Sequence, residues 1–398
     1  DARLQARLEQ LATRAMARRD PRLSLAIVLA DHETGDILAS VGSPGYDTGA
    51  GQGFVDMTRA LRSPGSTLKP LVYGLAFDRG LAHPETLISD TPVQFGRYAP
   101  QNFDGVFRGE LSVARALQLS LNIPVVRLTE ALGPAHVMAA LRRSGATPAL
   151  PGGQAGLAVS LGGLGLALED LVQVYAMLAQ QGDARPLRWR MDAATAKAER
   201  VMSTRAAWSV GHVLAGIAPP PGAGQPGRVA FKTGTSYGHR DALAIGFDGR
   251  HVAGVWMGRP DGTPVPGAFG GDLAAPLLFE VLGQVRHEPL PPPPPDALLV
   301  ANAELPLPLR RFGAGTEPNV PPLTLAFPPD GARMAGGDGV PMRLRDGAPP
   351  YTVLANGAVI AANLRQPAFT VPLTEPGFST LSVIDSAGRA ARVQIELR

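Results

Sequence analysis

Residues 62–70 read Arg62-Ser-Pro-Gly-Ser-Thr-Leu-Lys-Pro70, and from Ser66 onward the apolar pattern is helical. Positions three apart on a helix share a face, so the Ser66 hydroxyl and the Lys69 amine can approach each other. A serine at a helix N-terminus also lies where backbone N–H groups and the positive end of the helix dipole stabilise an oxyanion. A lysine acts as a base where burial or a nearby cation keeps part of its amine neutral. The stretch therefore predicts a serine nucleophile with a lysine base, although the same spacing is common in ordinary serine-capped helices.

A second motif, Ser120-Leu-Asn122, ends a helical stretch and is followed closely by Pro124. On its own a Ser-x-Asn sequence at a helix terminus is usually a cap or a turn. Its interest comes from its position in the chain, between the serine–lysine motif and a third one further on.

The third motif is Lys232-Thr-Gly-Thr-Ser236, at the end of a predicted strand. Gly234 would let the strand lie flat against neighbouring structure or ligand. Lys232 adds positive charge, and three hydroxyls are donors suited to a carboxylate. We predict that this segment binds substrate through Thr233, Gly234, Thr235 and Ser236.

Taken together, the three motifs are far more specific than any one of them. Ser-x-x-Lys, a Ser-x-Asn type motif and Lys-Thr-Gly form the active-site set of serine β-lactamases and penicillin-binding proteins. Here they occur in that order, on a helix, at a helix end and on a strand. The conjunction predicts an acyl-transferring serine enzyme.

Three longer stretches resemble the transpeptidase domain of the penicillin-binding protein 1C family. They are residues 62–70, Lys232-Thr-Gly-Thr-Ser-Tyr-Gly-His-Arg-Asp241 and Gly258-Arg-Pro-Asp-Gly-Thr-Pro-Val-Pro266, and residues 323–398 are similar to the family's small C-terminal domain. Family members carry an N-terminal membrane anchor and a glycosyltransferase domain, which this sequence does not contain. The resemblance implies a C-terminal portion on the periplasmic side of the bacterial inner membrane, anchored through an upstream segment and without glycosyltransferase activity.

The resemblance also implies a peptidoglycan DD-transpeptidase that cross-links stem peptides. Ser66 would be acylated by the penultimate D-Ala of a stem pentapeptide, with Lys69 taking its proton. Backbone N–H groups of Ser66 and Thr235 would form the oxyanion hole, and an amine from a neighbouring peptide would resolve the acyl-enzyme. β-Lactam antibiotics would acylate the same serine by mimicking D-Ala-D-Ala.

The remaining motif residues take supporting roles in this resemblance. Ser120 would relay a proton to the leaving or incoming amine, and Asn122 would hold the substrate amide. Lys232 would tune the electrostatics around the two serines, while Thr233 and Thr235 bind the substrate carboxylate.

Several other readings compete with a transpeptidase. A class A β-lactamase needs a glutamate that activates water, and Glu169 lies in a sequence that does not match, so we interpret it as a surface or capping carboxylate. A DD-carboxypeptidase uses the same motifs and stays open, as does a weakly active scaffold working through its C-terminal domain. A Ser-His-Asp hydrolase is disfavoured because no Gly-x-Ser-x-Gly surrounds Ser66 and neither His83 nor His136 has the context of a base.

Two further features have ordinary interpretations. Three glycines that precede a helix, without the lysine of a phosphate loop, are interpreted as a tight turn near the site: Gly162, Gly163 and Gly165. Trp256 alternates on a predicted strand and is expected in the core, whereas Tyr237 follows the third motif and could edge the site.

Composition narrows the class of protein. The chain has 398 residues, of which 45% are hydrophobic and 18% charged, so we expect two or three folded domains. A net charge of +3 without basic clusters gives no sign of nucleic-acid binding. No cysteine and only seven histidines without paired ligand spacing argue against a metal site, and no cofactor is expected. No apolar run is long enough to span a bilayer.

The order of predicted elements indicates an α+β fold of the penicillin-binding and serine β-lactamase type, an antiparallel sheet with helices on both sides. We expect an amphipathic helix over residues 1–20, a hairpin over 23–41, and helices that include 111–119 and 169–180. Residues 160–163 are loop-like, strands follow at 228–235, 241–247 and 251–258, and a helix follows at 274–286.

Domain boundaries follow from composition. We predict a transpeptidase domain over residues 1–288, a Pro-rich linker over 289–322 that includes the run from Pro291 to Pro295, and a small β-sandwich over 323–398. Turns are expected at residues 356–357, 376–377 and 386–388. The sandwich contains no histidine and is interpreted as a docking module for a cell-wall or periplasmic protein.

Overall fold

The computed structural model describes residues 1–46, 49–95, 98–190, 197–313, 323–335, 337, 339–386 and 389–398. The chain separates into two units. The first contains Asp1–Glu85, Val113–Ser120 and Val125–Ala301, and the second contains Thr86–Ser112, Leu121–Pro124 and Asn302–Arg398. Within these described ranges, no helix combines the length and the apolar character needed to cross a membrane.

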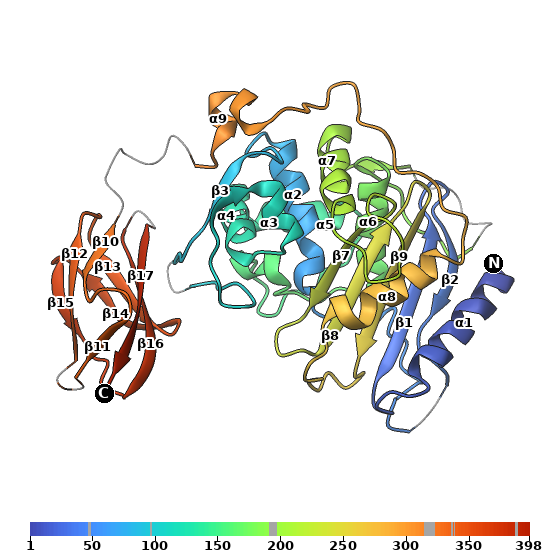
Figure 1. The fold of residues 1–398 in the computed structure, drawn as a ribbon. Helices are drawn as coiled ribbons and strands as arrows, with labels where there is room; N and C mark the ends of the chain where they lie inside the picture. The colour runs from blue at the N-terminus through green and yellow to red at the C-terminus, as the bar shows by residue number, and fades with distance from the viewer. Residues whose placement is uncertain are drawn as a thin grey trace. The chain divides into compact units, whose positions relative to one another are not determined.

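A five-stranded antiparallel sheet is the centre of the first unit (Figure 1). Its order is β2 (Asp36–Val41), β1 (Ser24–Asp31), β9 (His251–Gly258), β8 (Asp241–Phe247) and β7 (Ala230–Thr235). All residues of β1, β8 and β9 are buried, because helices cover both faces of the sheet. This explains their nearly continuous apolar sequences, and it confirms the predicted hairpin and strand meander; β7 begins two residues later than expected.

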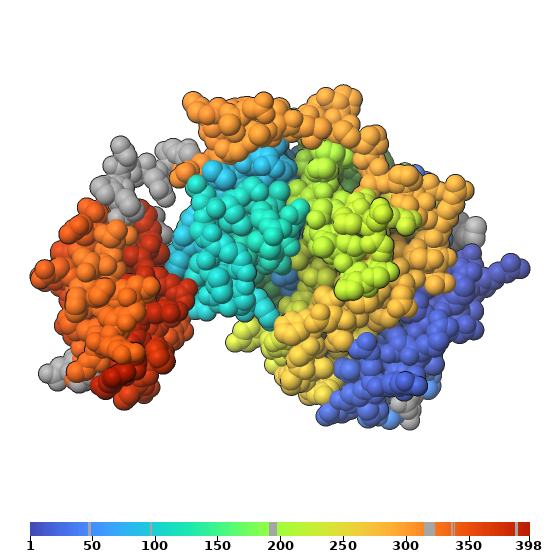
Figure 2. All heavy atoms as spheres, viewed as in Figure 1, coloured from blue at the N-terminus to red at the C-terminus, as the bar shows by residue number. Residues whose placement is uncertain are grey.

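Two helices cover one face of this sheet, α1 (Ala2–Met16) and α8 (Gly270–Leu282), drawn in blue and yellow-orange in Figure 2. Leu4, Leu8 and Leu11 lie on one side of α1 and pack in the same core as residues of α8 and the strands. The amphipathic N-terminal helix is confirmed. The helix predicted over 274–286 instead starts at Gly270 and ends before Gly283.

The opposite face carries α6 (Leu168–Ala179), which contacts β8 and β9, and α7 (Thr204–Ala215), which contacts β7. Helix α2 (Lys69–Asp78) packs on α7, and ten of the twelve residues of α6 are buried. The predicted α+β fold with helices on both sides of an antiparallel sheet is therefore confirmed. Smaller elements complete the unit: η1 (Gly65–Leu68), α3 (Val113–Gln118), α5 (Pro134–Arg143), η2 (Leu157–Leu161), β5 (Asp183–Ala184) and β6 (Glu199–Arg200).

Two local predictions were wrong. Residues 111–112 belong to β4 (Gly109–Ser112), which pairs with β3 (Leu87–Asp90), so the helix predicted over 111–119 begins only at Val113. The first two residues of the segment expected to be a loop at 160–163 end the short 3-10 helix η2. The first difference arises from pairing with a distant strand and the second from a short helical turn. Neither can be recognised from a run of apolar residues.

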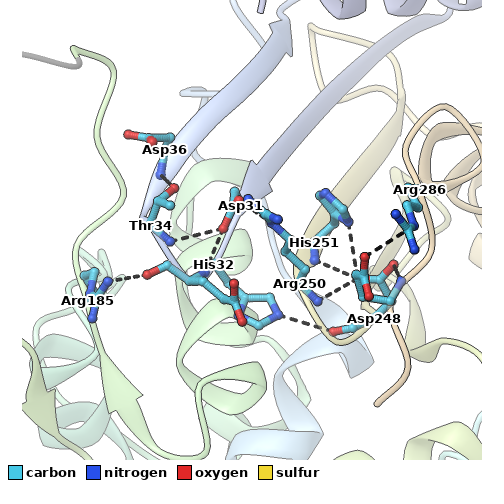
Figure 3. Close-up of polar contacts among 11 residues, drawn as sticks. Asp31, His32, Thr34, Asp36, Arg185, Asp248, Arg250, His251 and Arg286 are labelled. Carbon is cyan, nitrogen blue, oxygen red and sulfur yellow. Dashed lines mark hydrogen bonds and ion pairs between the residues drawn. The ribbon is translucent and has the colours of Figure 1, made fainter. Parts of the chain in front are cut away.

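A polar cluster fixes the β8–β9 end of the central sheet (Figure 3). The Asp248 side chain is 2% exposed and accepts hydrogen bonds from the backbone N–H groups of Arg250 (2.8 Å), His251 (2.6 Å) and Glu288 (3.2 Å). On the neighbouring strand, Asp31 accepts a hydrogen bond from Arg250 Nε at 2.8 Å. This cluster ties the chain that leaves α8 to the turn, at the end of β8 away from Asp241.

The second unit contains two β-sheets of the C-terminal region. One has the order β10 (Thr324–Phe327), β12 (Val340–Arg345), β15 (Ala368–Val371). The other has the order β11 (Ala332–Met334), β17 (Ala390–Leu397), β16 (Gly377–Ile384), β13 (Tyr351–Ala355), β14 (Ala358–Leu364). Alternate residues of β12 are buried, as a sheet with one solvent face requires, and both sheets share one hydrophobic core. The predicted all-β C-terminal region is confirmed.

The turns predicted in the C-terminal region and the predicted linker agree with the structure only in part. Asn356 and Gly357 join β13 to β14 as expected, whereas Gly377 already begins β16. Of the predicted turn at 386–388, residues 387 and 388 lie outside the described part of the chain, as do residues 314–322 of the predicted linker. The described part of that linker contains η3 (Asn302–Glu304) and α9 (Leu307–Arg310). The domain boundaries at 288 and 323 stay predictions.

Candidate active site

The serine–lysine motif lies where a 3-10 turn becomes an α-helix. Residues Gly65–Leu68 form η1, α2 begins at Lys69, and the Lys69 N–H donates to the Ser66 carbonyl. A 3-10 helix has three residues per turn, so side chains at positions i and i+3 lie one above the other. Pro70, at the first turn of α2, needs no hydrogen-bond partner for its nitrogen. The half-buried Ser66 is thus on the side of the helix that carries Lys69.

Lys69 is fully buried and reaches the second motif. Its Nζ donates to the backbone carbonyl of Ser120 and lies 3.4 Å from the Ser120 hydroxyl oxygen. Ser120 follows α3 in a left-handed backbone conformation with φ +59°. A residue other than glycine pays about 1–3 kcal/mol for such a conformation, and this strain is typical of functional sites. The structure therefore brings the first two motifs together through Lys69.

The third motif occupies β7, an edge strand of the central sheet. Lys232 is 2% exposed, and its Nζ donates to the Thr233 carbonyl at 3.0 Å. Burial lowers the pKa of Lys232 from 10.5 to about 7, because the charged amine loses its hydration. Thr233 and Thr235 are half-exposed, and Thr235 Oγ1 accepts a hydrogen bond from the Gly270 N–H at 3.1 Å, so its own O–H can donate elsewhere.

The end of β7 packs directly on the turn that carries Ser66. A Cβ added to Gly234 would lie 2.8 Å from the Pro64 carbonyl oxygen and 3.0 Å from the Thr67 nitrogen. Gly65 has φ +50°, and a Cβ there would lie 2.8 Å from the Thr235 carbonyl oxygen. Any side chain would separate the two segments, so glycine is required at both positions. The predicted close approach at Gly234 is confirmed.

A second glycine turn supports the Ser66 turn from another side. Gly162 ends η2 with φ +89°, and a Cβ there would come within 2.4 Å of the Gly65 nitrogen. Its carbonyl accepts the Ser63 hydroxyl at 2.7 Å, and the buried Tyr175 hydroxyl donates to the Thr67 carbonyl at 2.7 Å. The predicted tight turn near the site is confirmed, and the backbone around Ser66 is held on both sides.

Asn122 begins α4 (Asn122–Leu132), two residues after Ser120. Its N–H donates to Asn102 Oδ1 at 2.8 Å and its side-chain Nδ2 donates to the Gln101 carbonyl at 2.7 Å. Asn102 is in turn held by both carboxylate oxygens of Asp90, at 2.9 Å each. The sequence analysis missed this support, because Asn102 lies in an irregular segment and nothing in its neighbours marks it.

Ser236 differs from the prediction that its hydroxyl binds a substrate carboxylate. The residue is 3% exposed, and its Oγ donates to Asp241 Oδ2 at 2.7 Å while it accepts the Asp241 N–H at 2.9 Å. Both bonding directions are used inside the protein, which counts against a ligand role.

The neighbouring Tyr237 is 99% exposed, whereas Trp256 is 1% exposed and belongs to the core as expected.

The residues weighed for other chemistries have ordinary partners. Glu169, in the first turn of α6, accepts hydrogen bonds from the side chains of Thr58 (Oγ1, 3.1 Å) and Arg59 (Nε, 3.2 Å), whereas the backbone cap of this helix comes from Asp170. His83 Nε2 is 2.9 Å from the Leu298 carbonyl, and His136 Nδ1 is 3.0 Å from an arginine. Within the described residues, no group of three or more His, Asp or Glu side chains could hold a metal ion.

Comparison with known proteins agrees with this arrangement. Residues 25–255 match the model of the penicillin binding protein transpeptidase domain, and residues 313–395 match that of the penicillin-binding protein C-terminus family. The chain is 46% identical over 285 residues to penicillin-binding protein 1C of Escherichia coli, covering 71% of this chain and 37% of that protein. It is 30% identical over 276 residues to penicillin-binding protein 1B of Vibrio cholerae, covering 61% and 33%. The chain thus spans about a third of the length of these relatives.

Solved structures share the fold. The PonA1 protein of Mycobacterium tuberculosis in complex with penicillin V superposes with a TM-score of 0.63 at 20% identity, covering 74% of this chain and 87% of that one. The structure of the same protein described without that ligand gives a TM-score of 0.62, covering 75% and 91%. The family model covers more than half of this chain, and its three motifs fall inside that match. The chain belongs to the penicillin-binding protein transpeptidase family.

Proposed function

We propose that the chain is a peptidoglycan DD-transpeptidase that works through an acyl-enzyme on Ser66 and is inhibited by β-lactams. The observation that carries the proposal is the position of Lys69, which is fully buried, lies three residues after Ser66 and contacts Ser120. Lys69 follows Ser66 along the helix and contacts Ser120 on the loop after α3. A buried lysine in this position is suited to moving a proton between the two serine hydroxyl groups.

In the first step Lys69 takes the proton of the Ser66 hydroxyl while Ser66 Oγ attacks the carbonyl carbon of the penultimate D-Ala. The N–H groups of Ser66 and Thr235 stabilise the oxyanion of the tetrahedral intermediate. As the carbon–nitrogen bond breaks, Ser120 passes a proton to the departing amine of the terminal D-Ala and takes the proton held by Lys69 in its place. The products are the acyl-enzyme and free D-Ala.

The substrate carboxylate is assigned to the β7 side of the site. Lys232 supplies positive charge from beneath the strand, and the hydroxyls of Thr233 and Thr235 donate to the carboxylate oxygens. A bound anion favours the charged form of a nearby lysine, so it would raise the pKa of Lys232 above its value of about 7 in the empty site. Asn122 is assigned to the substrate amide.

In the second step the amine of a neighbouring stem peptide attacks the acyl carbon, and its proton returns through Ser120 to Lys69. As the ester bond to Ser66 breaks, Lys69 passes this proton to Ser66 Oγ, and the new amide cross-links the two peptides. Peptidoglycan lies outside the inner membrane, so we place this chemistry in the periplasm. We assign the C-terminal β-sheets to docking of a cell-wall or periplasmic protein.

The test uses a stem pentapeptide with and without an acceptor amine, followed by separation of the products by mass. We expect cross-linked dimers and free D-Ala with the wild-type chain, and neither product with Ser66→Ala. Trimmed tetrapeptide without any dimer, at saturating acceptor, would overturn transpeptidation in favour of a carboxypeptidase. No turnover of any kind by a chain that still binds penicillin would favour a scaffold role.

A further inference from the structure

A buried carboxylate lies just beyond the substrate strand and has no part in the mechanism above. Asp241 begins β8, six residues after Thr235, and its side chain is 5% exposed. Its Oδ2 accepts the Ser236 hydroxyl at 2.7 Å and its Oδ1 accepts the Trp256 Nε1–H at 2.9 Å. The Ser236 N–H donates to the Asp241 carbonyl at 3.0 Å. Asp241 therefore closes the β7–β8 turn and fixes the residue next to Thr235.

The same carboxylate faces a cation from the nucleophile segment. Arg62 Nε lies 3.9 Å from Asp241 Oδ1, and the Arg62 side chain is only 18% exposed. Its guanidinium carbon stands 5.5 Å from the ring centroid of Trp256, and its terminal nitrogen donates to the Pro260 carbonyl. The cation–π contact with Trp256 and the ion pair with Asp241 therefore hold the Arg62 side chain in place.

Arg62 is also fixed through its backbone. Its N–H and carbonyl exchange hydrogen bonds of 2.9 Å each with Leu166, in the segment that follows the Gly162 turn. Only three residues lie between Arg62 and Ser66. The Arg62–Asp241 pair consequently joins the chain just before the nucleophile to the chain just after Thr235.

We propose that Arg62 and Asp241 are positioning residues, which set the distance between the Ser66 turn and the end of β7 on which the oxyanion hole depends. The inference rests on the proposed function, because the two N–H groups assigned to that hole, those of Ser66 and Thr235, belong to the two segments that the pair joins. Glycine-to-backbone contacts stop these segments from moving closer together. The ion pair stops them from moving apart.

The opposite end of the sheet supplies a matched control. Asp31, 6% exposed, is paired with Arg250 Nε at 2.8 Å and also joins neighbouring strands (Figure 3). β8 runs from Asp241 at the site to Phe247 at that far end. Loss of either buried carboxylate removes an ion pair from the same sheet, and only the loss of Asp241 should alter the geometry around Ser66.

The experiment measures acylation by a fluorescent penicillin at several concentrations, which separates the initial binding constant from the acylation rate constant. We expect Asp241→Asn and Arg62→Met each to lower the acylation rate constant by about 10- to 100-fold, since misplacement by an ångström can cost about 100-fold. The initial binding constant should change less than about threefold, because the oxyanion forms only after binding. The double variant should be no slower than the slower single variant, since both break one tie.

Asp31→Asn should lower the melting temperature and leave the acylation rate constant within about twofold of wild type. Trp256→Phe replaces the indole by a smaller aromatic ring and loses the N–H donor to Asp241. It gives a second test if Asp241→Asn does not fold, and it should slow acylation about 3- to 10-fold. Additive effects of the two single variants, or normal acylation by folded Asp241→Asn or Trp256→Phe, would overturn the proposal. A wild-type chain that fails to react at Ser66 would instead refute the proposed function.

Discussion

Replacing Lys232 by methionine removes the buried amine of β7 and keeps a side chain of similar length. The pKa of Lys232 is lowered by burial from 10.5 to about 7. One pKa unit corresponds to about 1.4 kcal/mol, so holding the charged amine in the folded protein costs about 5 kcal/mol. Methionine bears no such cost, so it should stabilise the protein at neutral pH while removing the positive charge that we propose for substrate binding.

The sign of the pH dependence follows from the number of protons bound. Between pH 7 and 10.5 the unfolded chain holds the Lys232 proton and the folded chain has released it, so stability rises with pH in this window. The gain in stability from release of the Lys232 proton is complete above pH 10.5 and is lost as the pH falls to about 7. From pH 7.5 to 9.5 the wild-type chain should gain about 2–3 kcal/mol from this group alone.

Urea unfolding at pH 7.5 and 9.5, at fixed ionic strength, gives the free energy of unfolding at each pH. We expect the gain between the two pH values to be about 2–3 kcal/mol smaller for Lys232→Met than for wild type. Lys197 is exposed and provides the control, because Lys197→Met should leave the gain unchanged. Equal gains for wild type and Lys232→Met would refute the conclusion that burial keeps this amine largely neutral above pH 7.

Three further predictions concern the site and its support. Lys69→Met should lower the acylation rate by at least about 100-fold, as expected for loss of a general base, while circular dichroism shows a folded chain; an unfolded variant would point to a structural role. Gly65→Ala places a Cβ 2.8 Å from the Thr235 carbonyl, so penicillin labelling should fall below detection on a gel, and normal labelling would contradict the packing described. Burial favours a raised pKa for Asp248, but hydrogen bonds from the His251 side chain and from backbone N–H groups outweigh it and hold the pKa at about 2. Asp248→Asn should therefore abolish about 2 kcal/mol of stability that the wild type has above pH 4 and loses between pH 4 and 2, as acid titration of the unfolding free energy can check.

The central sheet was predictable where local chemistry and burial agree. The strands at 241–247 and 251–258 were predicted with the observed bounds, because Asp248-Gly249 interrupts an otherwise apolar run. Residues 111–112 were misassigned because their strand exists only through pairing with Leu87 and Ile88, more than twenty residues earlier. The start of α8 was hidden by Gly270 and Gly271, whose low helix propensity is overridden by packing against the sheet.

The candidate site was predictable to the extent that its members share short motifs. Ser66 and Lys69 are three residues apart, and this spacing has a direct geometric meaning. The tie between Arg62 and Asp241 was not predicted, although both residues lie inside the stretches that resemble the family, because their contact joins positions 179 residues apart. The hydroxyl of Ser236 was assigned to a ligand for the same reason, since the sequence does not reveal that Asp241 folds back onto it.

The central claim is that Ser66 becomes acylated. Intact-mass spectrometry of the chain after brief exposure to a penicillin, followed by peptide mapping, tests this claim most directly. We expect one adduct of the mass of the intact antibiotic, located on the peptide that contains Ser66 and absent from Ser66→Ala. An adduct on another residue, or an adduct of equal yield on the alanine variant, would contradict it.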